Sequence, residues 1–226
     1  MTTRFNNILF VCKEVLSWPI HYLIDILKDK DYSMSVFFIM PHEAMRNDPN
    51  FSSFKKLNKD INIYTAKEIG YNFLKAVKNH KIVVDYDYID TIEKKYTNYK
   101  TLGMQALTSQ LLSSYYHYRS YYPVVPLEKQ LYFFQLYYQY VEKLLNKINP
   151  DYIFDVDTAE HGRSILLEVA TYYKIPYVSL EHSRYKNYYI PTFNLGNEVN
   201  TWFKEEYEKL KSIISNEANY SSRSSE

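Results

Sequence analysis

Short apolar runs alternate with helix-like stretches along most of the chain, and this alternation constrains the fold more than any other feature. An apolar run without a helical period is typical of a strand buried on both faces, as in a parallel sheet. Strands that are joined through helices predict an α/β fold with a doubly wound, mostly parallel sheet. The runs that we interpret as strands are Asn7–Cys12, Met34–Met40, Ile61–Tyr64, Lys81–Asp85, Asp151–Asp155 and Tyr177–Leu180.

Among these runs, Asn7–Cys12 and Asp151–Asp155 are apolar on both faces, so we expect them to be parallel neighbours in the middle of the sheet. Amphipathic stretches separate the runs. The apolar positions from Ile20 to Leu27 follow the i, i+3, i+4, i+7 spacing of a helix that buries one face. Further helices are expected at Ala66–Asn79 and between Thr158 and Ile175.

Two long helices are predicted between the early and the late strands, at Leu102–Tyr118 and Leu127–Ile148. A heptad stripe on the second helix can pair with a partner in a coiled coil. Because Pro150 and a strand follow at once, we expect the stripe to pack inside its own chain instead. The stripe consists of Leu127, Leu131, Phe134, Tyr138, Val141, Leu145 and Ile148.

These elements predict one Rossmann-like α/β domain over residues 1–199, with residues 102–148 as a long helical insert. Loops are expected at Asn47–Ser53 and at Asp85–Tyr99, where no clear period is visible. The segment Asn200–Ile214 is rich in Lys and Glu and predicts a C-terminal helix. The tail Ser215–Glu226 is rich in Ser and is expected to be disordered.

Composition excludes several classes of protein. Lysine and arginine total 27 and aspartate and glutamate total 26, so a net charge of +1 argues against a strongly basic nucleic-acid binder. A single cysteine, Cys12, excludes a disulfide framework. The four glycines are scattered, so neither a G-x-G-x-x-G motif nor a P-loop is present. No apolar run approaches the ~18–20 residues that span a bilayer.

Polar side chains follow three of the predicted strands, where an open parallel sheet binds its ligands. Asp157, His161 and His182 are the candidates for a catalytic base, since a carboxylate or an imidazole can take a proton from a hydroxyl. Polar residues at strand ends also cap helices, which leaves a structural role open for Asp157. The residues that we assign to substrate binding are Lys13, Glu14, Trp18, Arg163, Glu181 and Arg184.

The triplet Asp155-Val156-Asp157 matches the D-x-D pattern of metal-dependent sugar transferases. Asp85-Tyr86-Asp87 matches the same pattern, so the signal is weak and we do not assign a metal site. A resident cofactor is not expected either.

The sequence P-D-Y-I-F-D-V-D-T, a helix, and then Y-K-I-P-Y-V-S-L-E-H-S-R span Pro150 to Arg184. This pattern resembles the last βαβ unit of the N-terminal domain of GT-B glycosyltransferases. The opening strand N-I-L-F-V-C, with a polar loop and an amphipathic helix after it, suits the same domain. The Tyr-rich stretch between Leu102 and Ile148 is similar to bacterial capsule and surface-polysaccharide biosynthesis proteins.

The resemblance implies the acceptor-side half of a glycosyltransferase that acts in the cytoplasm, with contact to the inner face of the cell membrane left open. A nucleotide-sugar would be the co-substrate and a carbohydrate the acceptor. GT-B enzymes have a second Rossmann-like domain that holds the donor, and we expect a C-terminal domain or subunit to supply it. Two alternatives stay open: a non-catalytic module that recruits a partner or a carbohydrate, and a small enzyme acting alone on a nucleotide or sugar phosphate.

Overall fold

The computed structural model describes residues 6–39, 48–97, 102, 126–157, 161–182, 189–192 and 205–213. Six strands form one sheet in the order β3-β2-β1-β4-β5-β6, in which β6 alone is antiparallel to its neighbour. The predicted class, α/β with a mostly parallel sheet, is therefore confirmed. The strands are β1 Asn7–Cys12, β2 Ser33–Phe38, β3 Asn62–Thr65, β4 Tyr152–Asp155, β5 Tyr177–His182 and β6 Tyr189–Thr192.

Strand β1 lies inside the sheet because both of its faces are apolar. Leu9 and Val11 face one hydrophobic core, while Phe10 and Cys12 face the other. All four side chains are buried. Strand β4 pairs with β1 in parallel, as the sequence predicted, and the structure places Val11 opposite Asp155.

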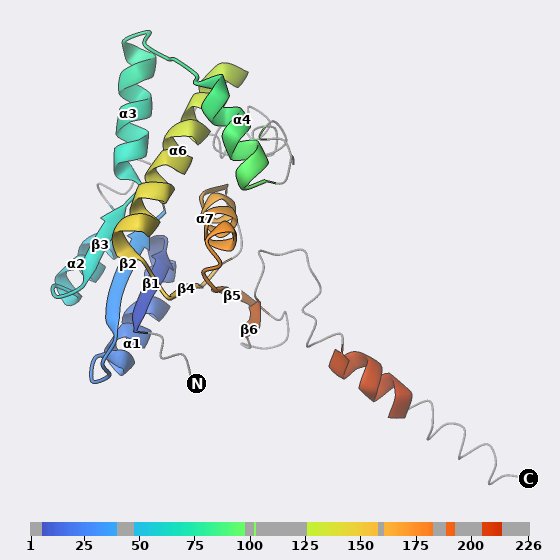
Figure 1. Cartoon of the computed structure of the whole chain (residues 1–226). Helices are drawn as coiled ribbons and strands as arrows, with labels where there is room; N and C mark the ends of the chain where they lie inside the picture. The colour runs from blue at the N-terminus through green and yellow to red at the C-terminus, as the bar shows by residue number, and fades with distance from the viewer. Residues whose placement is uncertain are drawn as a thin grey trace, which may run out of the picture.

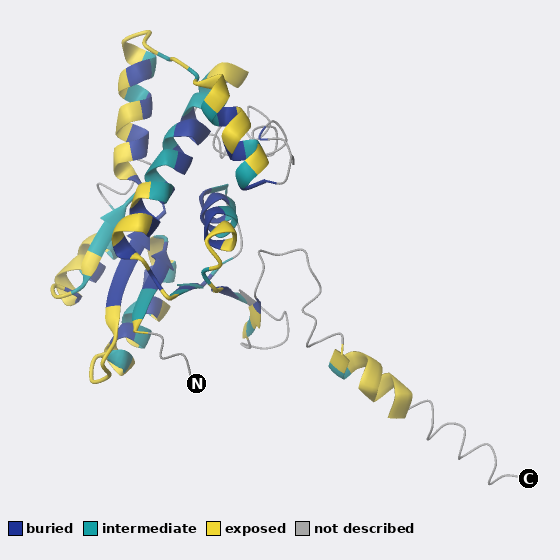
Figure 2. Cartoon of the chain, viewed as in Figure 1, coloured by how far each residue is buried: buried dark blue, intermediate teal, exposed yellow. Residues whose placement is uncertain are grey.

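Helices cover both faces of the sheet (Figure 1). On one face, α1 (Ser17–Leu27) and α2 (Pro49–Leu57) bury Ile20, Ile24 and Phe54 against the strands. The helices on the other side share the larger core and present their buried faces to one another (Figure 2). These are α3 (Lys67–Lys78), α4 (Tyr86–Lys95), α6 (Leu127–Ile148) and α7 (His161–Tyr172).

The heptad stripe of α6 packs inside its own chain, as expected. Its positions from Phe134 onward are buried, whereas Leu127 at the first turn is exposed. The helix ends at Asn149, whose φ of 47° lies in the left-handed region. The side chain of Asn7 in β1 then donates to the carbonyl of Ile148 at 2.6 Å, which ties the end of α6 to the sheet.

Two segments that we expected to be loops are helices. Asp48 caps α2 through hydrogen bonds from the backbone N–H groups of Asn50 and Phe51, and Pro49 occupies the first turn. Asp85 caps α4 in the same way, accepting from the backbone N–H of Tyr88 at 2.9 Å. A side chain that caps the first turn favours a helix, and a proline is tolerated at that turn.

The strand predicted at Lys81–Asp85 is wrong. The segment has no regular secondary structure and pairs with no described strand, and it leads directly into the cap of α4. Its β-branched residues indicate a strand, yet a strand needs a neighbour with which to form hydrogen bonds. Strand β6, a four-residue edge strand that contains Pro191, was not predicted.

Of the predicted insert, the structure describes Leu102 and residues 126–148, so most of the helix expected at Leu102–Tyr118 lies outside the described residues. Residues 205–213 form an exposed helix within the C-terminal helix predicted from Asn200 to Ile214. The tail from Ser215 lies outside the described residues. No helix in the described part of the chain is both long and apolar enough to cross a membrane.

Candidate functional site at the carboxyl edge

The chain changes direction in the sheet between β1 and β4. From β1 it continues to β2 and β3 on one side, and from β4 to β5 and β6 on the other. The loops that follow β1 and β4 therefore run in opposite directions from the carboxyl edge of the sheet. In open α/β sheets, such a switch point is where ligands bind. Four of the residues selected from the sequence, Lys13, Glu14, Asp157 and His161, follow these two strands.

The turn after β1 has an unusual backbone. Glu14 has a φ of 45°, in the left-handed region that a side chain disfavours, and it begins a short 3-10 helix (Glu14–Leu16) before α1. Backbone strain of this kind is frequent at functional sites. Ser17 then opens α1 with a buried hydroxyl that has no hydrogen-bond partner among the described residues.

Trp18 lies on the α2 side of this turn. Its indole N–H donates to the side-chain oxygen of Asn50 at 3.0 Å, and its ring meets that of His21 edge to face. The side chain is half-buried between α1 and α2. Lys13, at the start of the same turn, acts electrostatically on His161 at the start of α7.

Strand β4 ends in a buried polar network. Asp155 accepts hydrogen bonds from Arg163 Nε at 2.8 Å, from the Tyr177 hydroxyl at 2.6 Å and from the backbone N–H of Val156 at 2.7 Å. Both Asp155 and Arg163 are fully buried. These three hydrogen-bonding partners in a region of low dielectric make this a structural ion pair.

Arg163 thus lies in the interior of the domain, although we selected it as a substrate ligand. Its Nη1 is also 3.3 Å from Oδ2 of Asp157, whose side chain is 31% exposed. The buried guanidinium of Arg163 therefore holds the side chain of Asp157 on its inner side, while part of that side chain is exposed to solvent. Such an arrangement orients a carboxylate for contact with a ligand.

His161 opens α7 among aromatic rings. The rings of Phe133, Phe134 and Tyr137 approach its imidazole edge-on, with centroids 5.5–5.8 Å away. Burial lowers the pKa of His161 to about 4, and the positive charge of Lys13 adds to the effect. The imidazole is therefore neutral at pH 7 and is a weaker base than an exposed histidine. Its Nε2 is buried and has no hydrogen-bond partner among the described residues.

Strand β5 runs parallel to β4, so their carboxyl ends share one edge, as predicted. Glu181 and His182 are the last two residues of β5. Their side chains, and Arg184 as a whole, lie outside the part of the chain that the structure describes. That Asp157, His161, His182 and Arg184 line one crevice therefore stays a prediction.

Neither aspartate triplet gathers further metal ligands. Asp155 is engaged by Arg163, and Asp85 caps α4. Among the described residues, no three His, Cys, Asp or Glu side chains lie close enough together to hold a metal ion.

The sequence did not predict the hydrogen bond between the side chains of Tyr177 and Asp155. Both are strand residues, and they meet because β4 and β5 are neighbours in the sheet. The sequence also did not predict the close contact of α7 with α6, where a Cβ atom on Gly162 would lie 2.3 Å from the hydroxyl oxygen of Tyr137.

Comparison with protein-family models, with curated proteins and with solved structures finds no match for this chain.

Proposed function

We propose that this chain is the acceptor-side half of a GT-B-type glycosyltransferase of bacterial surface or capsular polysaccharide biosynthesis. The observation that carries the proposal is the switch point between β1 and β4, with the partly exposed Asp157 on one side and the strained turn at Glu14 on the other. The motif resemblance from Pro150 to Arg184 supplies the reaction class.

Two buried polar atoms support a ligand at this edge. Ser17 Oγ and His161 Nε2 both follow strands that end here, and neither has a hydrogen-bond partner among the described residues. A buried polar group without a partner costs about 1–3 kcal/mol, so a bound hydroxyl or phosphate oxygen that satisfies it is favoured.

In the proposed reaction, Asp157 takes the proton from an acceptor hydroxyl as its oxygen attacks the anomeric carbon of the donor. The bond from that carbon to the nucleotide phosphate breaks, and the nucleotide leaves with the electron pair. Arg163 positions Asp157 and does not touch the substrate. His161 is a neutral hydrogen-bonding group, and His182 is the second candidate for the base.

The donor nucleotide-sugar would be bound by a C-terminal domain or partner subunit, and the reaction would take place in the cytoplasm or at the inner face of the cell membrane. The first experiment is a pull-down with the full chain to identify that subunit. Transfer from nucleotide-sugars is then measured in the assembled enzyme.

Asp157→Asn is expected to lower turnover by about 10²-fold or more, because amides do not accept protons near neutral pH. The matched control is Asp29→Asn, at the exposed turn before β2 and on the opposite edge of the sheet. Full activity in Asp157→Asn would remove Asp157 as the base. Binding of a carbohydrate with no transfer in any assembly would favour the alternative of a non-catalytic module.

A further inference from the structure

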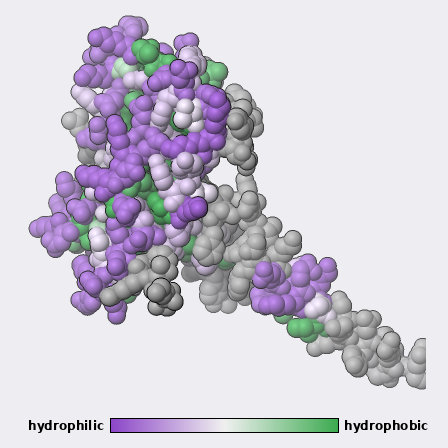
Figure 3. Space-filling view, in the orientation of Figure 1, coloured by the Kyte–Doolittle hydropathy of each residue, from purple (hydrophilic) through white to green (hydrophobic). Residues whose placement is uncertain are grey.

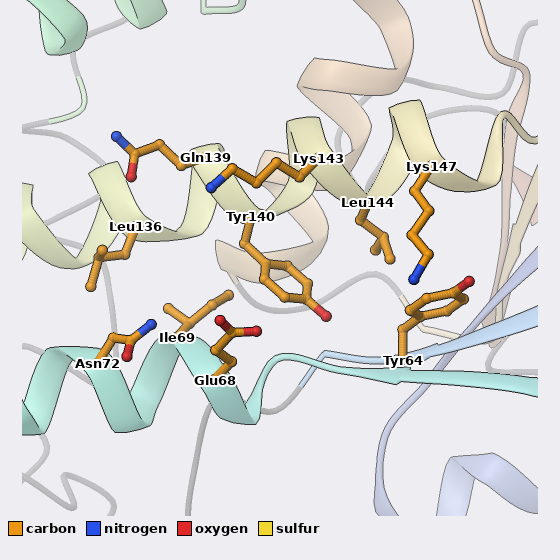
Figure 4. Close-up of a pocket in the computed structure, with 10 residues that line it drawn as sticks. All are labelled: Tyr64, Glu68, Ile69, Asn72, Leu136, Gln139, Tyr140, Lys143, Leu144 and Lys147. Carbon is orange, nitrogen blue, oxygen red and sulfur yellow. The ribbon is translucent and has the colours of Figure 1, made fainter.

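A cavity lies away from the switch point, in the groove between α3 and α6 beside the edge strand β3. Its volume is about 420 Å³, within the range of small-molecule sites. Strand β2 separates β3 from β1, so this cavity and the carboxyl-edge site belong to different parts of the sheet. Figure 4 shows the side chains from α3 and from α6 that line it on two sides.

The floor of the cavity is aromatic and fixed in place. The Tyr140 hydroxyl donates to the backbone carbonyl of Thr65 at 2.9 Å, and its ring stacks on Phe37 with centroids 5.9 Å apart. The ring of Tyr64 is covered by the ammonium group of Lys147, 5.1 Å from its centroid. Because these rings are already ordered, little conformational entropy is lost when a ligand packs on them.

The walls carry polar groups that the protein does not use. Glu68 and Asn72 come from α3, and Gln139 and Lys143 come from α6. Within the described part of the chain, none of these four side chains forms a hydrogen bond or an ion pair with another residue. Together they offer a carboxylate acceptor, two amides that donate and accept, and an ammonium donor.

This mixture defines a class of ligand. Sugar hydroxyls donate and accept, so they can satisfy carboxylate, amide and ammonium groups at once. The apolar C–H faces of a sugar ring suit an aromatic floor such as Tyr64 and Tyr140. Lys143 and Lys147 outnumber Glu68, so the cavity has an excess of positive charge. The surface around it is mostly hydrophilic on the face shown in Figure 3.

We propose that the groove between α3 and α6 binds an acidic saccharide unit, one or two sugar residues that carry a carboxylate. Lys143 binds the carboxylate, Glu68 and Asn72 bind ring hydroxyls, and the two tyrosines support the ring. The site lies beside β3, away from the switch point between β1 and β4, and does not depend on the transfer reaction proposed for Asp157.

The test is titration calorimetry of the full chain with three probes: a diuronate disaccharide, a neutral disaccharide of the same size, and acetate. The diuronate is expected to bind more tightly than the neutral sugar, and acetate is expected not to bind. Equal affinity for the neutral sugar would overturn the role of charge, and equal affinity for acetate would overturn the role of the sugar. No binding of either sugar would overturn the whole proposal.

Variants locate the site. Lys143→Met and Glu68→Gln are each expected to weaken diuronate binding about tenfold, the size of one lost charge-assisted hydrogen bond. Lys78→Met, on the last turn of α3 and outside the cavity, is the matched control. Unchanged affinity in both cavity variants would overturn the assignment. Asp157→Asn should leave diuronate binding intact, so failure here is distinguishable from failure of the transferase proposal.

Discussion

Arg163 keeps its charge in the interior because Asp155 compensates it, and Asp155 in turn is held by Tyr177 and by backbone N–H groups. Removing one member of such a pair leaves the other charge buried and alone, which costs about 3–5 kcal/mol. We therefore expect Arg163→Met to lower the free energy of unfolding by that amount in urea titrations. The double variant Asp155→Leu with Arg163→Met should recover most of the loss. A loss below about 1 kcal/mol in the single variant would contradict a structural pair.

His161 makes folding sensitive to acid. Its folded pKa of about 4 is below the ordinary value of 6.5, so the folded state resists protonation. The stability that its neutral form contributes is fully present above pH 6.5, and it is lost as the pH falls toward 4. A depression of this size corresponds to about 3 kcal/mol.

His161→Phe keeps an aromatic ring and cannot be protonated. Urea midpoints measured from pH 7 to pH 4 should fall less in this variant than in the parent protein. His80→Phe, in the exposed turn after α3, is the control. Parallel curves for the parent protein and His161→Phe would show that the imidazole is not buried as the structure has it.

At the scale of elements, the contact between α6 and α7 depends on Gly162, because a glycine has no side chain at this position. The Tyr137 hydroxyl donates to the carbonyl of Ile39 at 2.7 Å and occupies the space where a Cβ of Gly162 would lie. Tyr137 is fully buried, so it cannot move aside at low cost. Gly162→Ala should destabilise the protein by about 1–3 kcal/mol, the usual cost of overpacking. Because the ring carbon Cζ of Tyr137 would also lie 2.9 Å from this Cβ, restored stability in Gly162→Ala with Tyr137→Leu would identify the Tyr137 side chain as the obstacle.

The two ends of α6 should respond differently to truncation. Leu145 is buried against the sheet, whereas Leu127 is 55% exposed. Leu145→Ala is expected to cost about 2–5 kcal/mol and Leu127→Ala less than about 0.5 kcal/mol. Thermal unfolding of both variants, with sedimentation to follow oligomeric state, provides the measurement. A folded monomer produced from a dimer by Leu145→Ala would show instead that the stripe joins two chains.

Some elements were predictable because local sequence determines them. Strands β1, β4 and β5 are apolar runs, and burial on both faces leaves little choice of structure. Helices α2 and α4 also had readable signals, since Asp48 and Asp85 are caps, but their short, polar turns concealed the helical period. The strand wrongly predicted at Lys81–Asp85 shows the limit: a strand exists only where a neighbour is available.

The candidate site was predictable to the same extent. Parallel strands place their ends at one edge, so the strand order placed Asp157 and His161 just beyond β4, whereas the crevice that they were expected to share with His182 and Arg184 stays a prediction. The burial of Arg163 did not follow from the strand order, because it depends on the rotation of α7 about its axis. The cavity beside α3 was also missed, since residues from two stretches far apart in the sequence, 64–72 and 136–147, meet there and each stretch looks ordinary in the sequence.

At the scale of the whole molecule, the abundance of tyrosine has a structural explanation in part. The larger core uses tyrosine where phenylalanine would leave a polar group without a partner. Tyr88 donates to Glu142 at 2.8 Å, Tyr96 donates to the same carboxylate, and Lys95 is 3.3 Å from it. This group joins α4 to α6, and Lys95 also lies over the ring of Tyr172 in α7.

The position of Cys12 has a practical consequence for the study of this chain. It is the one cysteine in the sequence, and burial raises the pKa of its thiol, so the reactive thiolate is scarce while the domain is folded. Because Cys12 ends the central strand, a reagent reaches it only when that strand opens. Its alkylation rate therefore reports the opening of the sheet itself. A cysteine introduced on the surface can then be labelled selectively in the native protein.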